Sequence, residues 1–172
     1  MTPATYSACE LLRDGRPIEI RALRPSDEAG MLDAINHTNA ESLRRRFFVT
    51  KRAFSDKEKA FFMNADFVKH VALVAEIEKD HKREIIGGGR YVVVQAGEAE
   101  VAFIVIDAYR GQGIGTLLMH HLAVIARSAG LRELTADVLP ENAPMRKVFS
   151  KFGFEPRRGN DPQVVHLALA LQ

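Results

Sequence analysis

The order of hydrophobic and polar positions predicts several short strands in the first half of the chain. Apolar and polar residues alternate over Ile18–Leu23, and nearly continuous apolar runs occupy Val68–Ile77 and Ile85–Val94. Alternation is typical of a strand with one buried face, whereas a continuous run is typical of a strand buried on both faces. The charged segment Asp80–Glu84 separates the two runs, so we expect them to form a hairpin.

Helices are predicted between these strands. The segment Pro25–Ile35 has the residue types of a helix start, with Ser26 as its expected N-cap. A second short helix is expected near Asn39–Phe47. A third is expected to run from a capping box at Ser55 to about Asn64.

The second half of the chain alternates between strands and helices. The apolar run Val101–Ile106 ends in a glycine-rich loop, and Gly113–Ala129 follows with an apolar stripe at helical spacing. A strand is then expected at Leu134–Val138, a helix at Asn142–Phe152 and a strand at Val164–Leu171. Strands in succession, followed by interleaved helices and strands, predict a mixed sheet flanked by helices, in the α/β class.

Three glycines at alternate positions, Gly111, Gly113 and Gly115, lie between the run and the helix. Glycines let backbone N–H groups approach an anion, and the first amides of a helix have no helical partner, so this segment is typical of a pyrophosphate site. A tight connection is the competing interpretation, although a bare turn needs only one glycine. The loop lacks the lysine of a P-loop. A dinucleotide fold would use Asp137 for the ribose, but its glycine spacing differs and little chain follows for further βαβ units.

Two motifs resemble the GCN5-related N-acetyltransferase (GNAT) superfamily. Arg110-x-x-Gly113-x-Gly115 is similar to the Arg/Gln-x-x-Gly-x-Gly/Ala motif that holds the acetyl-CoA pyrophosphate in that family. Glu141–Phe154 is similar to a second motif, in which an asparagine opens a helix that ends in Gly-Phe. The resemblance spans residues 18–171 and implies a GNAT acyl-CoA N-acyltransferase fold with acetyl-CoA as co-substrate.

The resemblance also implies which residues hold acetyl-CoA. Backbone groups of Phe103–Val105 would pair with the pantetheine arm like an extra strand, and amides of residues 112–116 would bind the pyrophosphate. Asn142 would contact the pantetheine, and it is also a plausible helix N-cap. The expected cofactor-binding residues are Phe103, Ile104, Val105, Arg110, Gly111, Gln112, Gly113, Ile114, Gly115, Thr116, Asn142 and Phe149.

Acyl transfer to a lysine needs a base, because an amine with a pKa near ~10.4 is almost wholly protonated at neutral pH. The segment Glu98–Phe103 resembles bacterial protein-lysine acetyltransferases that act on acyl-CoA synthetases. In these a glutamate at the start of this strand deprotonates the lysine, which implies Glu100 as the general base. Glu100 shares a strand face with Ala102 and Ile104, an apolar setting that favours a carboxyl group poised as a base. A solvated glutamate is the alternative.

The group that protonates the leaving thiolate is an open question in the sequence. Many GNAT relatives place a tyrosine seven positions after the motif asparagine, as the general acid. Here that position is Phe149, which has no proton to give. Tyr109 is an alternative hydroxyl, but we expect it to pack.

Composition and net charge limit the classes of partner that we expect this chain to bind. Of the 172 residues, 47% are hydrophobic and 27% charged, and the net charge of +2 is too small to favour nucleic acid as a main partner. The apolar runs are too short to span a membrane, and the N-terminus lacks the pattern of a signal peptide. Cys9 is the one cysteine, which favours a reducing cytoplasm, and it lies in a segment, 1–16, that we expect to be mobile. The six histidines show no metal-ligand spacing, so no metal is expected, and His121 on the apolar stripe is expected to be a core histidine.

The sequence therefore predicts one N-acetyltransferase domain over residues 1–172, as a monomer or homodimer, with a protein lysine as the acceptor. The segment Glu41–Phe48 also resembles the protein-lysine subgroup. Its arginines, Arg44–Arg46, would guide an acidic substrate or the CoA 3′-phosphate, or they belong to a solvated helix end. A small-molecule amine acceptor and a non-catalytic acyl-CoA sensor remain open alternatives.

Overall fold

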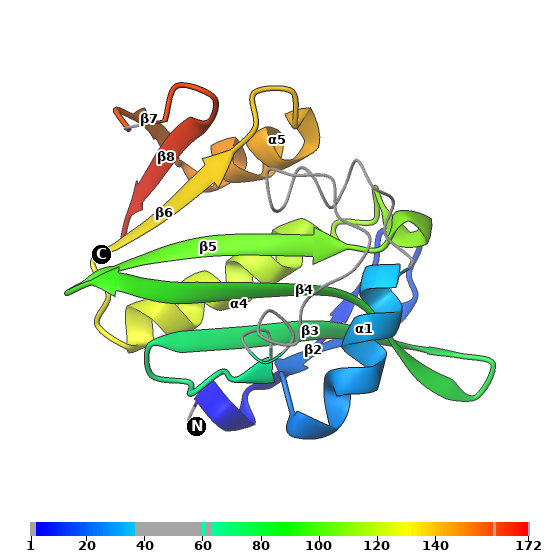
Figure 1. Ribbon diagram of the computed structural model, residues 1–172. Helices are drawn as coiled ribbons and strands as arrows, with labels where there is room; N and C mark the ends of the chain where they lie inside the picture. Colours follow the sequence, from blue (N-terminus) through cyan, green and yellow to red (C-terminus); the bar gives the residue numbers. More distant parts are fainter. Residues whose placement is uncertain (1–2, 37–59, 61–62, 160, 172) are drawn as a thin grey trace.

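An eight-stranded mixed sheet runs through the molecule (Figure 1). The computed structural model describes residues 3–36, 60, 63–159 and 161–171. The strands lie in the order β1-β2-β3-β4-β5-β6-β8-β7, and every neighbouring pair is antiparallel except β5 and β6. The strands are β1 (Ser7–Leu11), β2 (Pro17–Ala22), β3 (His70–Lys79), β4 (Lys82–Gln95), β5 (Glu98–Val105), β6 (Glu133–Val138), β7 (Glu155–Arg157) and β8 (Val165–Ala170).

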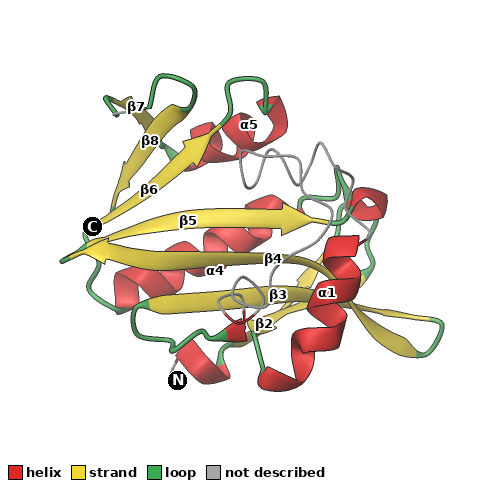
Figure 2. Cartoon of the chain, in the orientation of Figure 1, coloured by secondary structure: helices red, strands yellow, loops and turns green. Residues whose placement is uncertain are grey.

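Helices cover both faces of this sheet (Figure 2). A Cβ placed on Gly88 of β4 would lie 3.7 Å from Met31 Cε, whereas one on the adjacent Gly87 would lie 3.2 Å from Ile114 Cγ2. Successive strand residues point to opposite faces, so the helix that contains Met31 and the helix that begins at Ile114 lie on opposite sides of the sheet. The α-helices are α1 (Glu28–Asn36), α4 (Ile114–Ser128) and α5 (Ala143–Phe152), and short 3₁₀ turns occupy Pro3–Thr5, Pro25–Asp27 and Asp107–Tyr109.

Helix α5 shares its face of the sheet with α4. A Cβ on Gly115 of α4 would lie 3.9 Å from Val148 Cγ2 of α5. Phe149 of α5 also packs on Phe103 of β5, with 6.0 Å between ring centroids. The prediction of a mixed sheet flanked by helices is confirmed, and α4 and α5 leave the opposite face of β5 and β6 uncovered by either helix.

Residues 7–12 of the segment 1–16, which is expected to be mobile, are part of the sheet and the core. Residues 7–11 form strand β1, which pairs with β2 from Ser7 opposite Arg21 to Leu11 opposite Pro17. Leu12, which follows the strand, is only 3% exposed. Backbone pairing and this buried anchor fix the segment, although its alternating exposed and half-buried side chains give little hydrophobic signal. Cys9 lies in this strand and is exposed.

Ser26 does not cap the first helix. It lies inside a 3₁₀ turn, and the backbone N–H of Arg24 donates to the carboxylate of Asp27 at 2.7 Å instead. Asp27 also accepts two 2.8 Å hydrogen bonds from the buried guanidinium of Arg21. The ion pair thus holds the capping carboxylate in place, and α1 begins only at Glu28.

Two expected features lie outside the described residues. The helix near Asn39–Phe47, with Arg44–Arg46, is one, and the capping box at Ser55 is the other.

Candidate active site

A cleft opens where β5 and β6 part. The two strands pair in parallel only from Glu98 opposite Glu133 to Glu100 opposite Thr135. Beyond that point the two strands diverge, as Figure 1 shows. A cleft of about 410 Å³ lies beside the part of β5 that β6 leaves unpaired. The edge of β5 from Val101 to Val105 therefore faces the cleft rather than a neighbouring strand.

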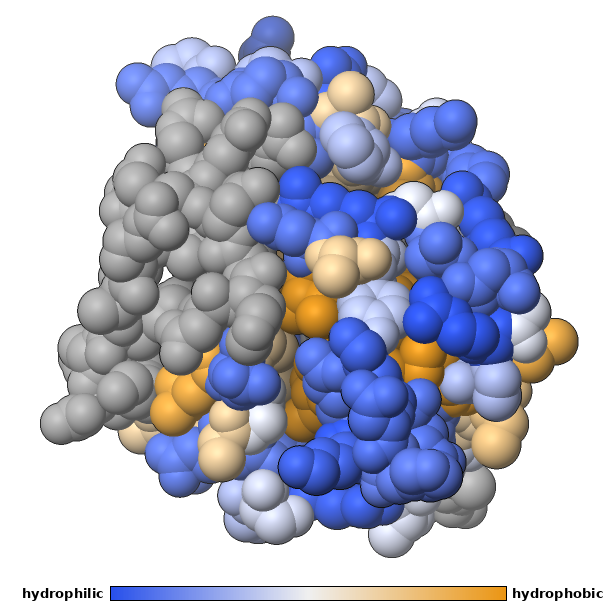
Figure 3. Space-filling view, turned by 90° about the vertical axis from the view of Figure 1, so that its right-hand side faces the viewer, coloured by the Kyte–Doolittle hydropathy of each residue, from blue (hydrophilic) through white to orange (hydrophobic). Residues whose placement is uncertain are grey.

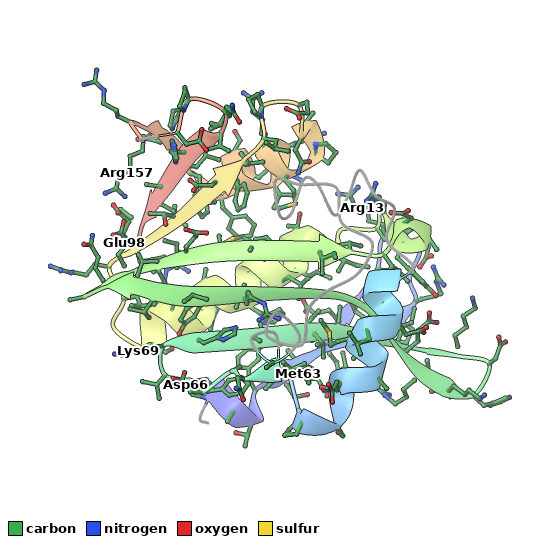
Figure 4. The ribbon with its side chains drawn as sticks, in the orientation of Figure 1. Arg13, Met63, Asp66, Lys69, Glu98 and Arg157 are labelled. Carbon is green, nitrogen blue, oxygen red and sulfur yellow. The ribbon has the colours of Figure 1, made fainter. Side chains whose placement is uncertain are left out.

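The paired end of β5 and β6 is held by a cluster of charged side chains. Arg157 of β7 donates to Glu98 at 2.9 Å, and it also contacts Glu133 (Figure 4). The side-chain amide of Gln95 donates to Glu98 as well. Bonds from two strands, β4 and β7, to the carboxylate of Glu98 thus fix the point from which the cleft opens.

The glycine loop forms one wall of the cleft. Gly111 and Gly113 have φ values of 78° and 88°, a conformation that L side chains rarely adopt. Gly113 is the N-cap of α4 and carries no side-chain cap, so the first amides of the helix remain available to a ligand in the cleft. A Cβ on Gly111 would meet nothing within 4 Å. Uncapped amides, the helix dipole and open space beside the backbone fit the diphosphate of a nucleotide-like ligand.

Arg13 supplies a positive charge at this loop, and sequence reasoning missed it. The backbone N–H of Arg13 donates to the carbonyl of Gln112 at 3.3 Å, and its guanidinium donates to the carbonyl of Gly111 at 3.1 Å (Figure 4). Its side chain lines the cleft. The contact joins positions 98 apart in sequence, so no local pattern could have indicated it.

The motif arginine behaves differently. The guanidinium of Arg110 forms a 2.9 Å ion pair with Asp107, three positions earlier. Arg110 still lines the cleft, but part of its charge is already balanced there. Arg13, whose guanidinium donates to the backbone carbonyl of Gly111, is the stronger candidate for an anionic ligand.

Helix α5 forms the opposite wall. Asn142 is its N-cap, with a side-chain oxygen that accepts from the backbone N–H of Met145 at 3.4 Å. Phe149 is 3% exposed, and its ring lies 4.9 Å from that of Phe154. Tyr109, the alternative hydroxyl, is also buried, with the guanidinium of Arg16 5.2 Å from its ring centroid. Both aromatic residues pack, as the sequence suggested.

Glu100 lies at the inner end of the cleft, on the face of β5 that points away from α4. Its neighbours Val101 and Phe103 are buried, while Ala102 and Ile104, on the face of Glu100, are half-buried. Glu100 itself is exposed, so the apolar setting expected for it is only partly present. A carboxylate at this position is accessible to a substrate that approaches from the face of β5 that points away from α4.

The structure brings the predicted site residues together. Glu100 and all the expected cofactor-binding residues except Gln112 line the one cleft. The cleft is also lined by four further charged residues: Arg13, Asp137, Lys147 and Lys151. Seen from the open end, hydrophobic atoms show between hydrophilic ones (Figure 3). Apolar and charged residues that line the same cleft suit a ligand with a thioester arm and a phosphate head.

Other expectations concern metals, membranes and His121. Within the described ranges, no group of three His, Cys, Asp or Glu residues could hold a metal ion, and no helix there is long and apolar enough to cross a membrane. His121 is 6% exposed, and its Nδ1 lies 2.5 Å from the hydroxyl of Tyr6. Burial lowers the pKa of His121, against the opposing effect of Glu10 at 3.3 Å, so it is a core histidine.

Residues 36–154 match the model of the acetyltransferase (GNAT) family. The chain belongs to this GNAT family. It is 31% identical over 160 residues to Acetyltransferase PA5475 of Pseudomonas aeruginosa, an alignment that covers 91% of this chain and 86% of the relative. It is also 31% identical over 144 residues to Acetyltransferase Pat of Mycolicibacterium smegmatis, covering 83% of this chain but 42% of Pat. This GNAT chain is an acetyl-CoA-dependent acetyltransferase.

Among solved structures, the GNAT domain of S. lividans PAT superimposes with a TM-score of 0.89. The two chains are 35% identical, and the alignment covers 96% of this chain and 97% of the other. The likeness therefore extends through the whole GNAT fold, including the N-terminal strand pair that carries Arg13.

Proposed function

We propose that this GNAT chain transfers the acetyl group of acetyl-CoA to a protein lysine side chain, with Glu100 as general base. The observation that carries the proposal is the shared cleft: the glycine loop and Glu100 line the same 410 Å³ space. The resemblance of Glu98–Phe103 to bacterial protein-lysine acetyltransferases supports a protein acceptor.

The cleft offers a binding place for each part of acetyl-CoA. The diphosphate binds the amides at the start of α4, beside the guanidinium of Arg13. The pantetheine arm runs along the edge of β5 at Phe103–Val105, which β6 leaves open. Asn142 lies on the other wall and lines the same space, so its side chain contacts the arm while it caps α5. The thioester then lies toward the paired end of the strands, near Glu100.

The chemistry follows from this placement. The acceptor arrives as an ammonium, and the Glu100 carboxylate removes a proton so that the nitrogen lone pair can attack the thioester carbonyl. The C–N bond forms as the C–S bond breaks, and CoA leaves as a thiolate. Phe149 stands where many relatives carry an acid and cannot donate. The thiolate therefore takes its proton from water or from the second proton of the attacking amine.

The alternatives predict different behaviour. A non-catalytic sensor would bind acetyl-CoA and release no CoA thiol with any amine. A small-molecule acetyltransferase would release thiol with simple amines but not with folded proteins. The carboxylate of Glu100 inside the cleft argues against the sensor.

Two measurements test the proposal. Calorimetry should show that acetyl-CoA binds the wild-type chain and that Gly113→Glu weakens binding at least ~100-fold, because a side chain and a negative charge enter the amide cradle. Gly130→Glu is the control, since Gly130 also has a positive φ, tolerates a side chain with nothing within 4 Å of its Cβ, and lies past the far end of α4. Equal affinities in both variants would contradict the assigned site.

The acceptor is tested by release of CoA thiol. A panel of acyl-CoA synthetases and of small primary amines is offered with acetyl-CoA, and mass spectrometry locates any acetylated lysine. Acetylation of one lysine on a protein, well above the rate with small amines, is the expected result. Turnover of the small amines alone would replace the protein-lysine proposal by the small-molecule one.

A further inference from the structure

A second carboxylate, Asp137, lines the cleft and has no role in the reaction described above. We propose that Asp137 binds the ammonium of the acceptor and that His166 holds Asp137 in position. The inference rests on the proposed function, because it needs an amine acceptor, and it names the residue that selects a charged one.

Strand register places Asp137 on the same face as Glu100. Glu100 pairs with Thr135 across β5 and β6, and paired residues point to the same face of a sheet. Asp137 lies two residues further along β6, so it points to that face too, with its Cα about 8 Å or more from that of Glu100 by standard strand spacings. Both carboxylates line the cleft, on the side that α4 and α5 do not cover.

His166 orients the carboxylate of Asp137. His166 pairs with Asp137 across β6 and β8, and its Nδ1 lies 2.6 Å from Oδ1 of Asp137. Its Nε2 lies 3.1 Å from the backbone carbonyl of Asp161. Only a protonated imidazole donates from both nitrogens, so this geometry belongs to an imidazolium.

The surroundings of His166 agree with this charge and keep the ring in place. Although burial opposes it, the hydrogen bond and charge of Asp137 raise the pKa of His166. A Cβ on Gly159 would lie 1.8 Å from Cδ2 of His166, so the backbone at Gly159 passes directly against the ring. This loop therefore blocks movement of the ring toward Gly159.

This arrangement suits an ammonium ligand. A carboxylate has two oxygens, and the bond to His166 uses Oδ1. An acceptor that enters from the face that α4 and α5 do not cover would meet both carboxylates, because Asp137 and Glu100 line the same cleft. Because the imidazolium balances the charge of Asp137, the second oxygen of Asp137 would accept a hydrogen bond from the ammonium, and the charge of Glu100 would supply the attraction for a cation. Asp137 would hold the ammonium while Glu100 takes its proton.

The test compares a charged acceptor with an uncharged one. The probes are Nα-acetyl-lysine amide, whose ε-amine is an ammonium at neutral pH, and methoxyamine, which is neutral there; the best protein acceptor of the panel above is added. Asp137→Asn keeps the size of the side chain and removes its charge. We expect KM for the two lysine acceptors to rise about tenfold, as loss of one charge-assisted hydrogen bond predicts. Neither kcat nor the methoxyamine rate should change by more than about twofold.

Three further variants complete the design. His166→Gln should raise KM for lysine about threefold, and the double variant should be no worse than Asp137→Asn, because His166 acts through Asp137. Asp137→Glu should retain the preference for the charged acceptor. Glu155→Gln is the control, since it removes an exposed carboxylate from β7 of the same sheet without lining the cleft.

Each possible outcome of these experiments supports or overturns the role of Asp137. An unchanged KM for lysine, or an equal loss with lysine and methoxyamine, overturns the role of Asp137. If Asp137→Asn does not fold, the ratio of the two acceptors in His166→Gln decides instead, and an unchanged ratio there overturns the proposal. A failure of the proposed function is distinguishable, because Glu100→Gln would then leave thiol release unchanged as well.

Discussion

The two ends of the β5–β6 pair use carboxylates in opposite ways. At the paired end, Glu98 and Glu133 are bound by Arg157, and Gln95 adds a further bond to Glu98. At the open end, Glu100 is exposed and lines a cleft, although it lies only two residues beyond Glu98 on the same face of β5. Glu98 thus belongs to the framework that holds the strands together, whereas Glu100 borders the cavity in which a substrate would lie.

The backbone shows the same contrast. At the paired end the backbone groups of β5 are bonded to β6, and at the open end the edge of β5 from Val101 onward is left for a ligand. Unpaired strand edges recruit other extended chains, and a pantetheine arm can serve as one. In the proposed arrangement, the position at which the ladder stops would set where acetyl-CoA lies and which glutamate reaches its thioester.

The largest predicted effect is on Glu100. Glu100→Gln keeps the shape of the side chain and removes the base, so turnover with a lysine acceptor should fall ~10²–10⁴-fold. The pH–rate profile should also lose its acidic limb, while the affinity for acetyl-CoA in calorimetry stays within about twofold. Near-normal turnover would show that the open-end carboxylate is as structural as Glu98, and the base would have to be sought elsewhere.

Phe149 tests whether the helix side of the open end is a packed wall. Phe149→Ala should destabilise the protein by about 3–5 kcal/mol in urea unfolding, because the ring is 3% exposed and packs on Phe103 and Phe154. Phe149→Tyr should raise turnover only modestly. A large rate gain with unchanged stability would instead indicate that the wild-type cleft lacks an acid it can use, and the sensor interpretation would gain weight.

A smaller effect is expected at Arg13, at the outer end of the cleft. Arg13→Ala should weaken acetyl-CoA binding about tenfold in low salt, and less at high salt because exposed charges are screened. Arg16→Ala is the control, since Arg16 pairs with Asp14 and does not line the cleft. Equal losses in the two variants would mean that general positive charge, rather than the position of Arg13 on the glycine loop, attracts the donor.

Local patterns in the sequence predicted most of the fold. The apolar runs and the helical stripe predicted β2 to β6, β8, α1, α4 and α5 to within a few residues. Strand β1 was missed because its side chains are exposed or half-buried, so that backbone pairing rather than burial holds it. Strand β7 was missed because it has three exposed residues with a proline at its centre.

The site was predictable only where its residues are neighbours in sequence. The glycine loop, Asn142 and Glu100 belong to short motifs, and the cleft brings them together. Arg13 reaches the loop across 98 positions, and His166 reaches Asp137 across 29. Such contacts depend on strand order, which one sequence does not reveal.

The smallest effect is predicted at the paired end itself. Arg157→Ala should lower Tm by no more than about 2–4 °C and leave turnover unchanged, because Arg157 is a surface residue and surface ion pairs stabilise little.

The stabilisation by Arg157 should also depend on pH. Although burial opposes it, hydrogen bonding among Glu98, Glu133 and Arg157 lowers the pKa of Glu98. A carboxyl with a lowered folded-state pKa stabilises the fold above its unfolded pKa, about 4.3, and this stabilisation is lost as the pH falls further. The Tm difference between Arg157→Ala and the wild type, measured by circular dichroism with Arg158→Ala as control, should therefore be largest near pH 7 and shrink below about pH 4. A loss of turnover at unchanged Tm would show that the charged cluster sets the opening of the cleft, and the two ends of the strand pair would then act as one unit.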